Sequence, residues 1–226
     1  MIWKEISDDK SHYELEECKG SEHIQSALDL NEAKTFWDDK FNQDIPKLSF
    51  EELCDEMLWR SEKEFDFDIN VDDSTRDVLE RFQPDNWETL DIDERHDAIK
   101  ELVKCISDLL GIPEVPDVVF WDDGDNSCGF YSERGNYIGI NENYLDDANE
   151  LIDTIAHETR HAYQHYRAEL SETPQDEIYR FNFEHYIAPE YDSGGYCVNY
   201  FDYYDQYIEA EARAFAKQFF KGEDYE

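Results

Sequence analysis

Positive charge is scarce in this sequence, and the shortage limits the partners that the protein can bind. Its 226 residues include 20 Lys and Arg against 58 Asp and Glu, which gives a formal net charge of −38 at pH 7. Such a surface repels nucleic acid and anionic membranes and attracts basic molecules over a long range. We therefore expect no direct nucleic-acid binding and no membrane binding. We favour solubility, together with a preference for basic substrates, as the role of the acidic surface; mimicry of DNA is the alternative.

Long apolar runs and paired cysteines are also missing. Nowhere do 18 apolar residues follow one another, and residues 1–10 contain no apolar stretch of the kind found in signal peptides. The five cysteines are scattered and form no C-x-x-C pair, which is typical of reduced thiols: Cys18, Cys54, Cys105, Cys128 and Cys197. We therefore expect a cytoplasmic protein whose cysteines pack in its core, and we leave its oligomeric state open.

Glycine and proline are few, with 9 and 6 residues, whereas aromatic residues are many, with 15 Tyr, 14 Phe and 5 Trp. A chain this rich in aromatic residues is expected to fold despite its charge. Hydrophobic periodicity predicts helices at about 22–40, 49–64, 74–82 and 91–110. Acidic and apolar residues alternate in residues 66–73, which predicts either a short strand or an acidic loop.

The second half of the chain begins with short apolar runs rather than helical patterns. Pro113 and Pro116 end the helical part, and the runs that follow predict strands at 118–121, 129–131 and 137–140. The last two strands are expected to form a hairpin with its turn at 133–136. Helices followed by a small sheet and further helices predict an α+β fold.

The most informative motif is His157-Glu158-Thr159-Arg160-His161, which has the pattern H-E-x-x-H inside a stretch, Leu151 to Tyr166, that is expected to be helical. Histidines four residues apart share one helix face and can reach one metal ion. The adjacent Glu158 can then act as a base toward a metal-bound water, an arrangement that suits zinc. Around the helix axis, His157 lies about 200° and His161 about 240° from the apolar Ile155. The histidines therefore face away from the core, which predicts that they line a cleft. A solvated helix face is the alternative.

A third ligand is expected from a second amphipathic helix. Ile208, Ala212, Phe215 and Phe219 form one apolar stripe, and the alternating alanines of residues 210–216 allow another helix to approach closely. A carboxylate from this helix would complete a zinc site with two histidines and one acid. Glu209 and Glu211 both qualify, and either could instead be a solvated acid.

These residues resemble the gluzincins, the zinc peptidases in which an H-E-x-x-H helix is followed by a second helix that donates a glutamate. Several gluzincin branches carry E-x-x-A on the second helix, and Glu209-Ala210-Glu211-Ala212 fits that frame with Glu209 as the ligand. Arg213 departs from the Asp or Asn that is usual at the next position. The segment is also similar to the E-x-E-A-x-x-F-A ending of peptidases that cleave repressors.

A closer resemblance is to uncharacterised bacterial proteins that carry H-E-L-R-H-A-Y-Q, a Tyr-rich stretch and then E-x-D-A-x-x-F. The matching segments here are His157–Gln164 and Tyr204–Phe215, and the similarity covers about residues 112 to 220. It implies that His157, His161 and Glu209 hold zinc while Glu158 activates a zinc-bound water against a peptide bond. It also implies a minimal zincin-like catalytic domain at 111–226. The mainly helical region before it, 1–110, resembles no family, and we expect it to serve substrate or partner recognition.

A zinc peptidase also needs a donor for the oxyanion that forms beside the metal, and gluzincins often use Tyr or His. The residues between and around the two helices offer Tyr196, Tyr204, Tyr207 and His185, of which we select Tyr196 and Tyr207 as catalytic candidates. The small sheet is expected either to bind an extended peptide along its edge strand or to be purely structural.

The resulting prediction is a zinc metallopeptidase that acts on a protein or peptide substrate. The main alternative is an acidic binding or inhibitor protein, a DNA mimic or an antitoxin-like partner, whose zinc is structural or vestigial. A third class is a toxin whose helical first half recognises its target.

Overall fold

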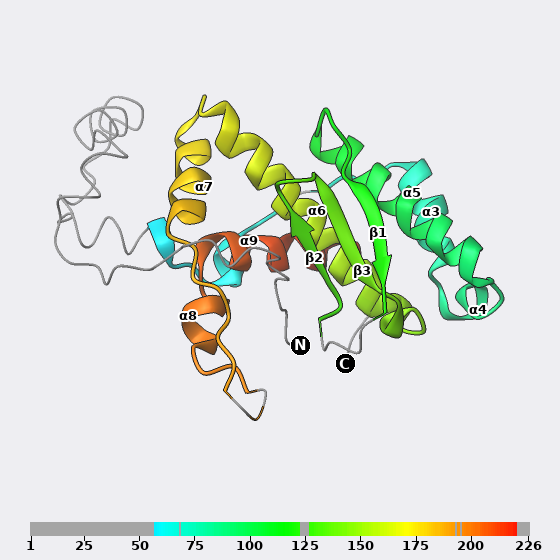
Figure 1. The fold of residues 1–226 in the computed structure, drawn as a ribbon. Helices are drawn as coiled ribbons and strands as arrows, with labels where there is room; N and C mark the ends of the chain where they lie inside the picture. Colours follow the sequence, from blue (N-terminus) through cyan, green and yellow to red (C-terminus); the bar gives the residue numbers. More distant parts are fainter. Residues whose placement is uncertain (1–56, 68, 123–126, 193, 195, 221–226) are drawn as a thin grey trace, which may run out of the picture.

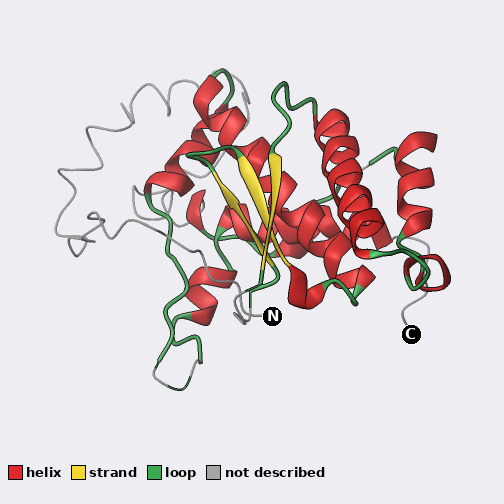
Figure 2. Cartoon of the chain, turned by 45° about the vertical axis from the view of Figure 1, so that its right-hand side comes forward, coloured by secondary structure: helices red, strands yellow, loops and turns green. Residues whose placement is uncertain are grey.

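The computed structural model describes residues 57–67, 69–122, 127–192, 194 and 196–220. The helix predicted at 22–40 lies outside the described residues. The described chain has an α+β fold in which a three-stranded sheet and several helices surround one long helix, α6 (Ala148–Leu170), as Figures 1 and 2 show. The predicted α+β class is therefore confirmed.

Three α-helices whose bounds lie within the described residues precede the sheet. They are α3 (Asp73–Arg81), α4 (Pro84–Trp87) and α5 (Ile92–Leu110). Asp91 caps α5, with Glu94 completing a capping box, and Gly111 ends the helix with a φ of 71° that suits glycine. The helices predicted at 74–82 and 91–110 are thus confirmed to within one residue.

The sheet consists of β1 (Asp117–Trp121), β2 (Gly129–Ser132) and β3 (Tyr137–Asn141), in the order β1-β3-β2. Strand β1 runs parallel to β3, and β2 runs antiparallel to it. A turn at 133–136 joins β2 and β3, as predicted. All three predicted strands are confirmed, each within one residue of its expected bounds.

The remaining helices are α7 (Pro174–Glu184), α8 (Tyr200–Tyr204) and α9 (Tyr207–Ala216), with short 3-10 helices η2 (Glu62–Glu64), η3 (Glu142–Tyr144) and η4 (Lys217–Phe220). A capping box with Pro174 at the first helical position begins α7, a helix that the periodicity of the sequence did not predict. No helix among the described residues is long and apolar enough to cross a membrane.

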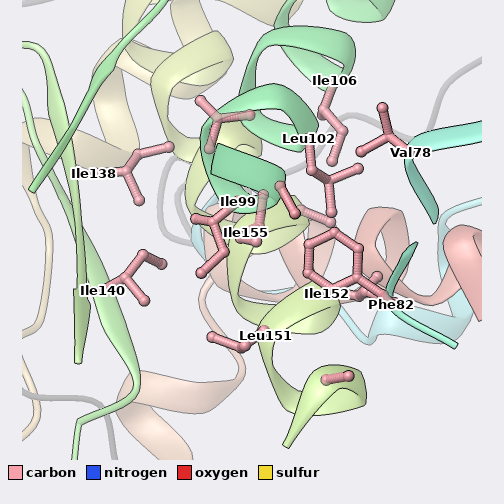
Figure 3. Close-up of a cluster of buried hydrophobic side chains, with 14 of the residues drawn as sticks. Val78, Phe82, Ile99, Leu102, Ile106, Ile138, Ile140, Leu151, Ile152 and Ile155 are labelled. Atoms are coloured by element: carbon pink, nitrogen blue, oxygen red, sulfur yellow. The ribbon is translucent and has the colours of Figure 1, made fainter. Parts of the chain in front are cut away.

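One hydrophobic core joins α5, the sheet and α6. Figure 3 shows Ile99 and Leu102 of α5 facing Ile138 and Ile140 of β3, with Ile155 of α6 among them. All of these side chains are fully buried. Val78 and Phe82 extend the same core toward α3, and Phe215 extends it toward α9. The division of the chain at residue 110 stays a prediction.

The prediction of a helix at 49–64 is wrong for the end of this range that the structure describes. Helical residues stop at Leu58, Trp59 pairs with Gln206 in an isolated bridge, and Ser61 caps the separate 3-10 helix η2. The backbone N–H of Arg60 donates to the carbonyl of Asp205, so a contact with a distant segment replaces the next helical hydrogen bond. Of the two interpretations of residues 66–73, the described residues fit the loop, because none of them is in a strand.

Candidate metal centre

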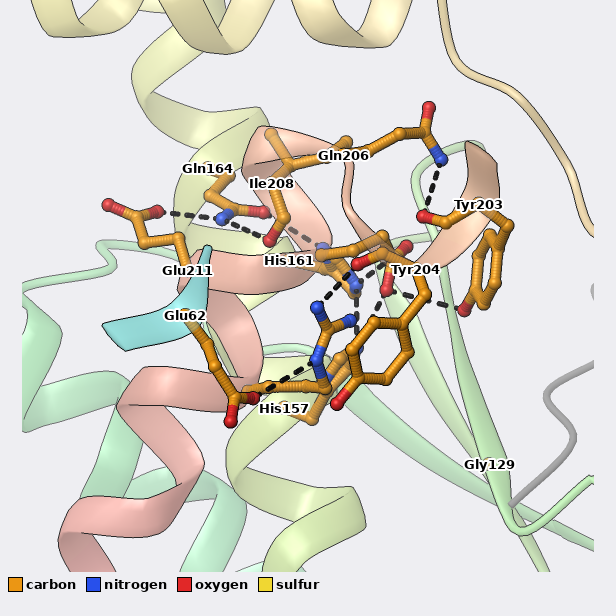
Figure 4. Close-up of polar contacts among 12 residues, drawn as sticks. Glu62, Gly129, His157, His161, Gln164, Tyr203, Tyr204, Gln206, Ile208 and Glu211 are labelled. Carbon is orange, nitrogen blue, oxygen red and sulfur yellow. Dashed lines mark hydrogen bonds and ion pairs between the residues drawn. The ribbon is translucent and has the colours of Figure 1, made fainter. Parts of the chain in front are cut away.

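The site lies where α6 and α9 pack against each other. Small side chains allow the close approach: Ala210, Ala212 and Ala216 are all fully buried. One face of α6 turns Ile155 into the core, and α9 covers the opposite face, which carries the histidines (Figure 4). The histidine face was predicted to line a cleft, whereas His157 is only 2% exposed in the structure.

His157, His161 and Glu209 converge on one point. The two Nε2 atoms are 3.0 Å apart; His157 Nε2 lies 3.3 Å from Oε2 of Glu209, and His161 Nε2 lies 3.5 Å from Oε1. An ion with tetrahedral bonds of about 2.0–2.1 Å needs ligand atoms about 3.3–3.4 Å apart. The three observed separations lie close to that value, so these residues fit a zinc ion.

Electrostatics at the three groups also suit a cation. Burial opposes protonation of His161, but the negative charge of Glu209 outweighs it and raises the pKa of His161 to about 9. Burial lowers the pKa of His157 to about 4. The two histidines hold the pKa of Glu209 well below its usual range, despite its burial. The carboxylate of Glu209 is therefore ionised and the imidazole of His157 is neutral. A cation is favoured beside these two groups.

A hydrogen-bond network fixes the orientation of His161. The amide nitrogen of Gln164 donates to the carbonyl of Ile208 at 3.0 Å and to Oε2 of Glu211 at 2.7 Å. Its amide oxygen therefore faces Nδ1 of His161, 2.8 Å away, and accepts the Nδ1 proton. Because that proton sits on Nδ1, the lone pair of Nε2 in the neutral ring points at the convergence point.

Glu211, the other predicted ligand, has different partners. Its carboxylate accepts from Nη2 of Arg160 at 2.9 Å and from the hydroxyl of Tyr179 at 2.8 Å, in addition to Gln164. The Arg160 guanidinium is itself buried among aromatic rings, at 4.5 Å from the ring centre of Tyr163. Glu211 therefore balances a buried cation on the far side of Gln164, and the structure brings Glu209 alone of the two to the histidines.

Two tyrosines that sequence reasoning missed hold Glu209. The hydroxyl of Tyr186 donates to Oε1 at 2.8 Å, and the hydroxyl of Tyr203 donates to Oε2 at 3.3 Å. Burial and the charges of Glu209 and Glu158 raise the pKa of Tyr203 well above its usual range, so the hydroxyl stays a donor. The richness of residues 172–203 in tyrosine pointed to this region but could not distinguish one ring from another.

The predicted tyrosines lie elsewhere. Tyr196 is 74% exposed, and the hydroxyl of Tyr207 donates to the side chain of Gln175 at 3.2 Å. The ring of Tyr204 stacks beneath Arg213, while Nδ1 of His185 bonds to the carbonyl of Phe181. The structure does not bring these four side chains to Glu209.

Glu158 is buried, with 4% of its surface exposed. Its negative charge adds to that of Glu209 in raising the pKa values of both His161 and Tyr203, so the carboxylate lies within electrostatic range of these two groups. His165, one turn beyond His161, instead stacks on Phe183 and pairs with Glu133. It stays outside the metal set, as expected.

Comparison with known proteins adds no family to this description. No family model matches the sequence, and no curated protein or solved structure matches the chain. The metal centre therefore rests on the geometry of its own residues. Within the described part of the chain, His157, His161 and Glu209 form the group of side chains close enough to hold a metal ion.

Proposed function

We propose that the protein is a zinc metallopeptidase of the gluzincin type, in which His157, His161 and Glu209 bind the metal. One observation carries the proposal: the Nε2 atoms of the H-E-x-x-H histidines are 3.0 Å apart, and they lie 3.3 and 3.5 Å from the two carboxylate oxygens of Glu209 on a second helix. The minimal zincin-like arrangement that we propose consists of the three-stranded sheet, α6 and α9. Its sheet has the antiparallel strand β2 at one edge.

Zinc held by three protein ligands acidifies a water and polarises a carbonyl group. The chain's own residues supply the rest. Glu158, beside His157 on α6, takes a proton from the attacking water and later delivers it to the leaving amine. The hydroxyl of Tyr203 bonds to Glu209 and lies within the field of Glu158, and it is the donor that we assign to the developing oxyanion.

Strand β2 is the surface that we assign to the peptide. A Cβ atom on Gly129 would lie 2.5 Å from Cγ2 of Thr154, so glycine lets this strand approach the helix that carries the histidines. Among the described strands, β2 pairs with β3 alone, which leaves its other edge available for an added strand.

A structural metal in an acidic binding protein is the second candidate, and burial is the observation that favours it. His157, Glu158 and Glu209 are each exposed by 4% or less. Structural zinc sites are closed to solvent, whereas catalytic ones keep a position open for water. A peptide can reach the proposed centre only if part of its cover moves.

The decisive experiment compares the wild-type protein with Glu158→Gln and with Glu169→Gln, an exposed acid on the same helix. Zinc content is measured per chain, and hydrolysis is followed on a mixture of unstructured peptides. We expect about one zinc per chain in all three proteins. Hydrolysis should fall by at least about 100-fold in Glu158→Gln and stay unchanged in Glu169→Gln.

Two results would contradict the proposal. Zinc retained by His157→Ala/His161→Ala would show that the motif does not bind the metal. A zinc-loaded wild-type protein that hydrolyses no peptide would favour the structural-metal alternative.

A further inference from the structure

The segment that connects α7 to α9 extends from the body of the protein. Figure 1 shows α8 and the chain before it projecting below α7 and α9, away from the sheet. We call residues 187–206 the aromatic finger. Its base is closed by Gln206, whose side chain accepts from the backbone N–H of Ile187 at 2.7 Å and donates to the carbonyl of Ile187 at 2.9 Å.

The finger exposes large apolar side chains in one short stretch: Tyr196 (74%), Val198 (63%), Tyr200 (41%) and Phe201 (75%). Elsewhere in the described chain the exposed large apolar residues are isolated on separate elements: Ile92, Val119 and Leu170. Single exposed apolar residues need no explanation, but a contiguous group indicates an interaction surface.

The finger also has a defined shape. The backbone N–H of Val198 donates to the carbonyl of Glu190 at 2.8 Å, and that of Asp192 donates to the carbonyl of Tyr196 at 3.0 Å. The side chain of Asn199 joins the two sides, since its amide donates to the carbonyl of Ala188 at 2.9 Å. The backbone that carries the exposed aromatic rings is therefore ordered before any partner binds, which lowers the entropy lost on binding.

Charge identifies the partner. Residues 187–206 contain no Lys, Arg or His, and their acidic residues are all exposed: Glu190, Asp192, Asp202 and Asp205. A surface that alternates acids with aromatic rings attracts Lys and Arg side chains through both charge and cation–π contact. One such contact already exists at the base of the finger, where the Arg213 guanidinium lies 3.4 Å from the ring centre of Tyr204.

The stack continues outward from that contact. The ring of Tyr204 stacks on Tyr200 with centroids 5.0 Å apart, and Tyr200 is one of the exposed rings. The finger is also joined to the metal centre, because Tyr186 immediately before it and Tyr203 within it both donate to Glu209. A partner bound to the finger thus lies beside the elements that cover the site.

We infer that the aromatic finger is the docking surface for cationic polypeptides, and that Arg- and Lys-rich chains are the substrate class of the proposed peptidase. The choice of substrate rests on the proposed function, whereas docking itself does not. Arginine side chains stack on Tyr196, Tyr200 and Phe201 while the neighbouring carboxylates balance their charge.

Binding is tested on Glu158→Gln protein, so that no peptide is cleaved. The probes are fluorescently labelled peptides of alternating Arg and Ser, with alternating Gly and Ser as the neutral peptide, and the readout is fluorescence anisotropy. We expect the Arg peptide to bind more tightly than the neutral one. Its affinity should fall steeply with salt, as the Debye length shrinks from about 30 Å at 0.01 M to about 10 Å at 0.1 M.

Matched variants separate the finger from the general acidic field. Tyr196→Ser/Phe201→Ser should weaken binding of the Arg peptide by about tenfold or more, whereas Val119→Ser/Leu170→Ser, two exposed apolar residues elsewhere, should not. Asp202→Asn/Asp205→Asn should weaken it more than Asp77→Asn/Asp85→Asn, which changes the net charge equally at exposed acids of α3 and α4.

Three outcomes would overturn the inference. The first is equal affinity for the Arg peptide and the neutral peptide, and the second is an equal loss of affinity for the Arg peptide in the finger and control variants. The third is a change in the sedimentation of Tyr196→Ser/Phe201→Ser with unchanged peptide affinity, which would make the finger an interface between copies of the protein. The proposed function fails separately: if the finger binds Arg peptides but the zinc-loaded wild-type protein cleaves no peptide, docking stands and the peptidase proposal does not.

Discussion

The Nδ1 atom of His161 lies 2.8 Å from the amide oxygen of Gln164, one helical turn further along α6. The same amide donates to Glu211, whose carboxylate is held by Arg160. A chain of buried polar groups therefore runs from a buried ion pair to the proposed zinc ligand. Such outer partners set the tautomer and direction of a ligating imidazole.

The first prediction is that Gln164→Leu weakens zinc binding by about 10–100-fold, because His161 loses the acceptor that fixes its ring. Competition with a chromophoric chelator gives the Kd. Tyr179→Phe is the matched control, since it removes another hydrogen bond to Glu211 without touching His161. An equal loss of zinc affinity in both variants would mean that the network acts only through general stability.

The second prediction separates the two glutamates of α9. Glu209→Gln should lose stoichiometric zinc, because the carboxylate that faces both histidines is neutralised. Glu211→Gln should keep zinc but unfold more easily by about 3 kcal/mol, since Arg160 is left buried without its counter-charge. Zinc analysis and urea unfolding in the presence of chelator measure the two effects. The opposite pattern would reassign the ligand to Glu211.

The features that were predicted correctly from the sequence depend on residues that lie close together in the chain. The core periodicity of α5, its Gly111 stop and the three apolar runs of the sheet are short-range signals, and each appears in the structure within a residue of its expected place. The H-E-x-x-H spacing likewise depends on helix geometry alone, which is why His157 and His161 could be paired before any fold was known.

Contacts between distant segments account for what the sequence did not predict. The residues alone left Glu209 and Glu211 open, and the resemblance to gluzincins selected Glu209. The physical reason that Glu211 is occupied elsewhere, its contact with Arg160 across the helix interface, is contained in neither spacing nor composition. Tyr186 and Tyr203 reach Glu209 from the base of the finger, which closes through Gln206 and Ile187. Helix α7 did carry a local signal, the capping box of Thr173 and Asp176 with Pro174.

The third prediction concerns pH and Asp153, one turn before His157 on α6. Burial, with the nearby charge of Glu150, raises the pKa of Asp153 from 3.8 to about 6. The folded state therefore binds the proton more tightly than the unfolded state, and the stability contributed by the protonated carboxyl is lost as pH rises from about 4 through about 6. Asp153→Asn should be more stable than wild type at pH 7 by roughly 2–3 kcal/mol.

Urea unfolding between pH 5 and pH 7.5, with chelator present, checks this prediction. Asp176→Asn is the control of opposite sign. Burial alone would raise the pKa of Asp176, but hydrogen bonds from Arg167 hold this pKa below its ordinary value. Its ionised form stabilises the fold, so the variant should be less stable than wild type at neutral pH, with the deficit shrinking only as pH falls through the folded-state pKa. A pH-independent difference for Asp153→Asn would contradict the assignment.

The fourth prediction assigns different roles to the two tyrosines on Glu209. Tyr203 lies within the field of Glu158 and is our oxyanion donor, whereas the hydroxyl of Tyr186 donates to Oε1 of Glu209. Tyr203→Phe should lower kcat on peptides by about 100-fold even when zinc saturates the site. Tyr186→Phe should weaken zinc binding about tenfold, with kcat unchanged once zinc saturates the site, because its hydroxyl only orients the ligand.

Steady-state kinetics at saturating zinc, alongside zinc titration, distinguish the two roles. Tyr207→Phe serves as the control, because its hydroxyl bonds to Gln175 and does not reach Glu209. It should leave both quantities unchanged. If Tyr207→Phe lowered kcat as much as Tyr203→Phe, the tyrosine selected from the sequence would be the donor, and α9 would have to turn during the reaction to bring it to the metal.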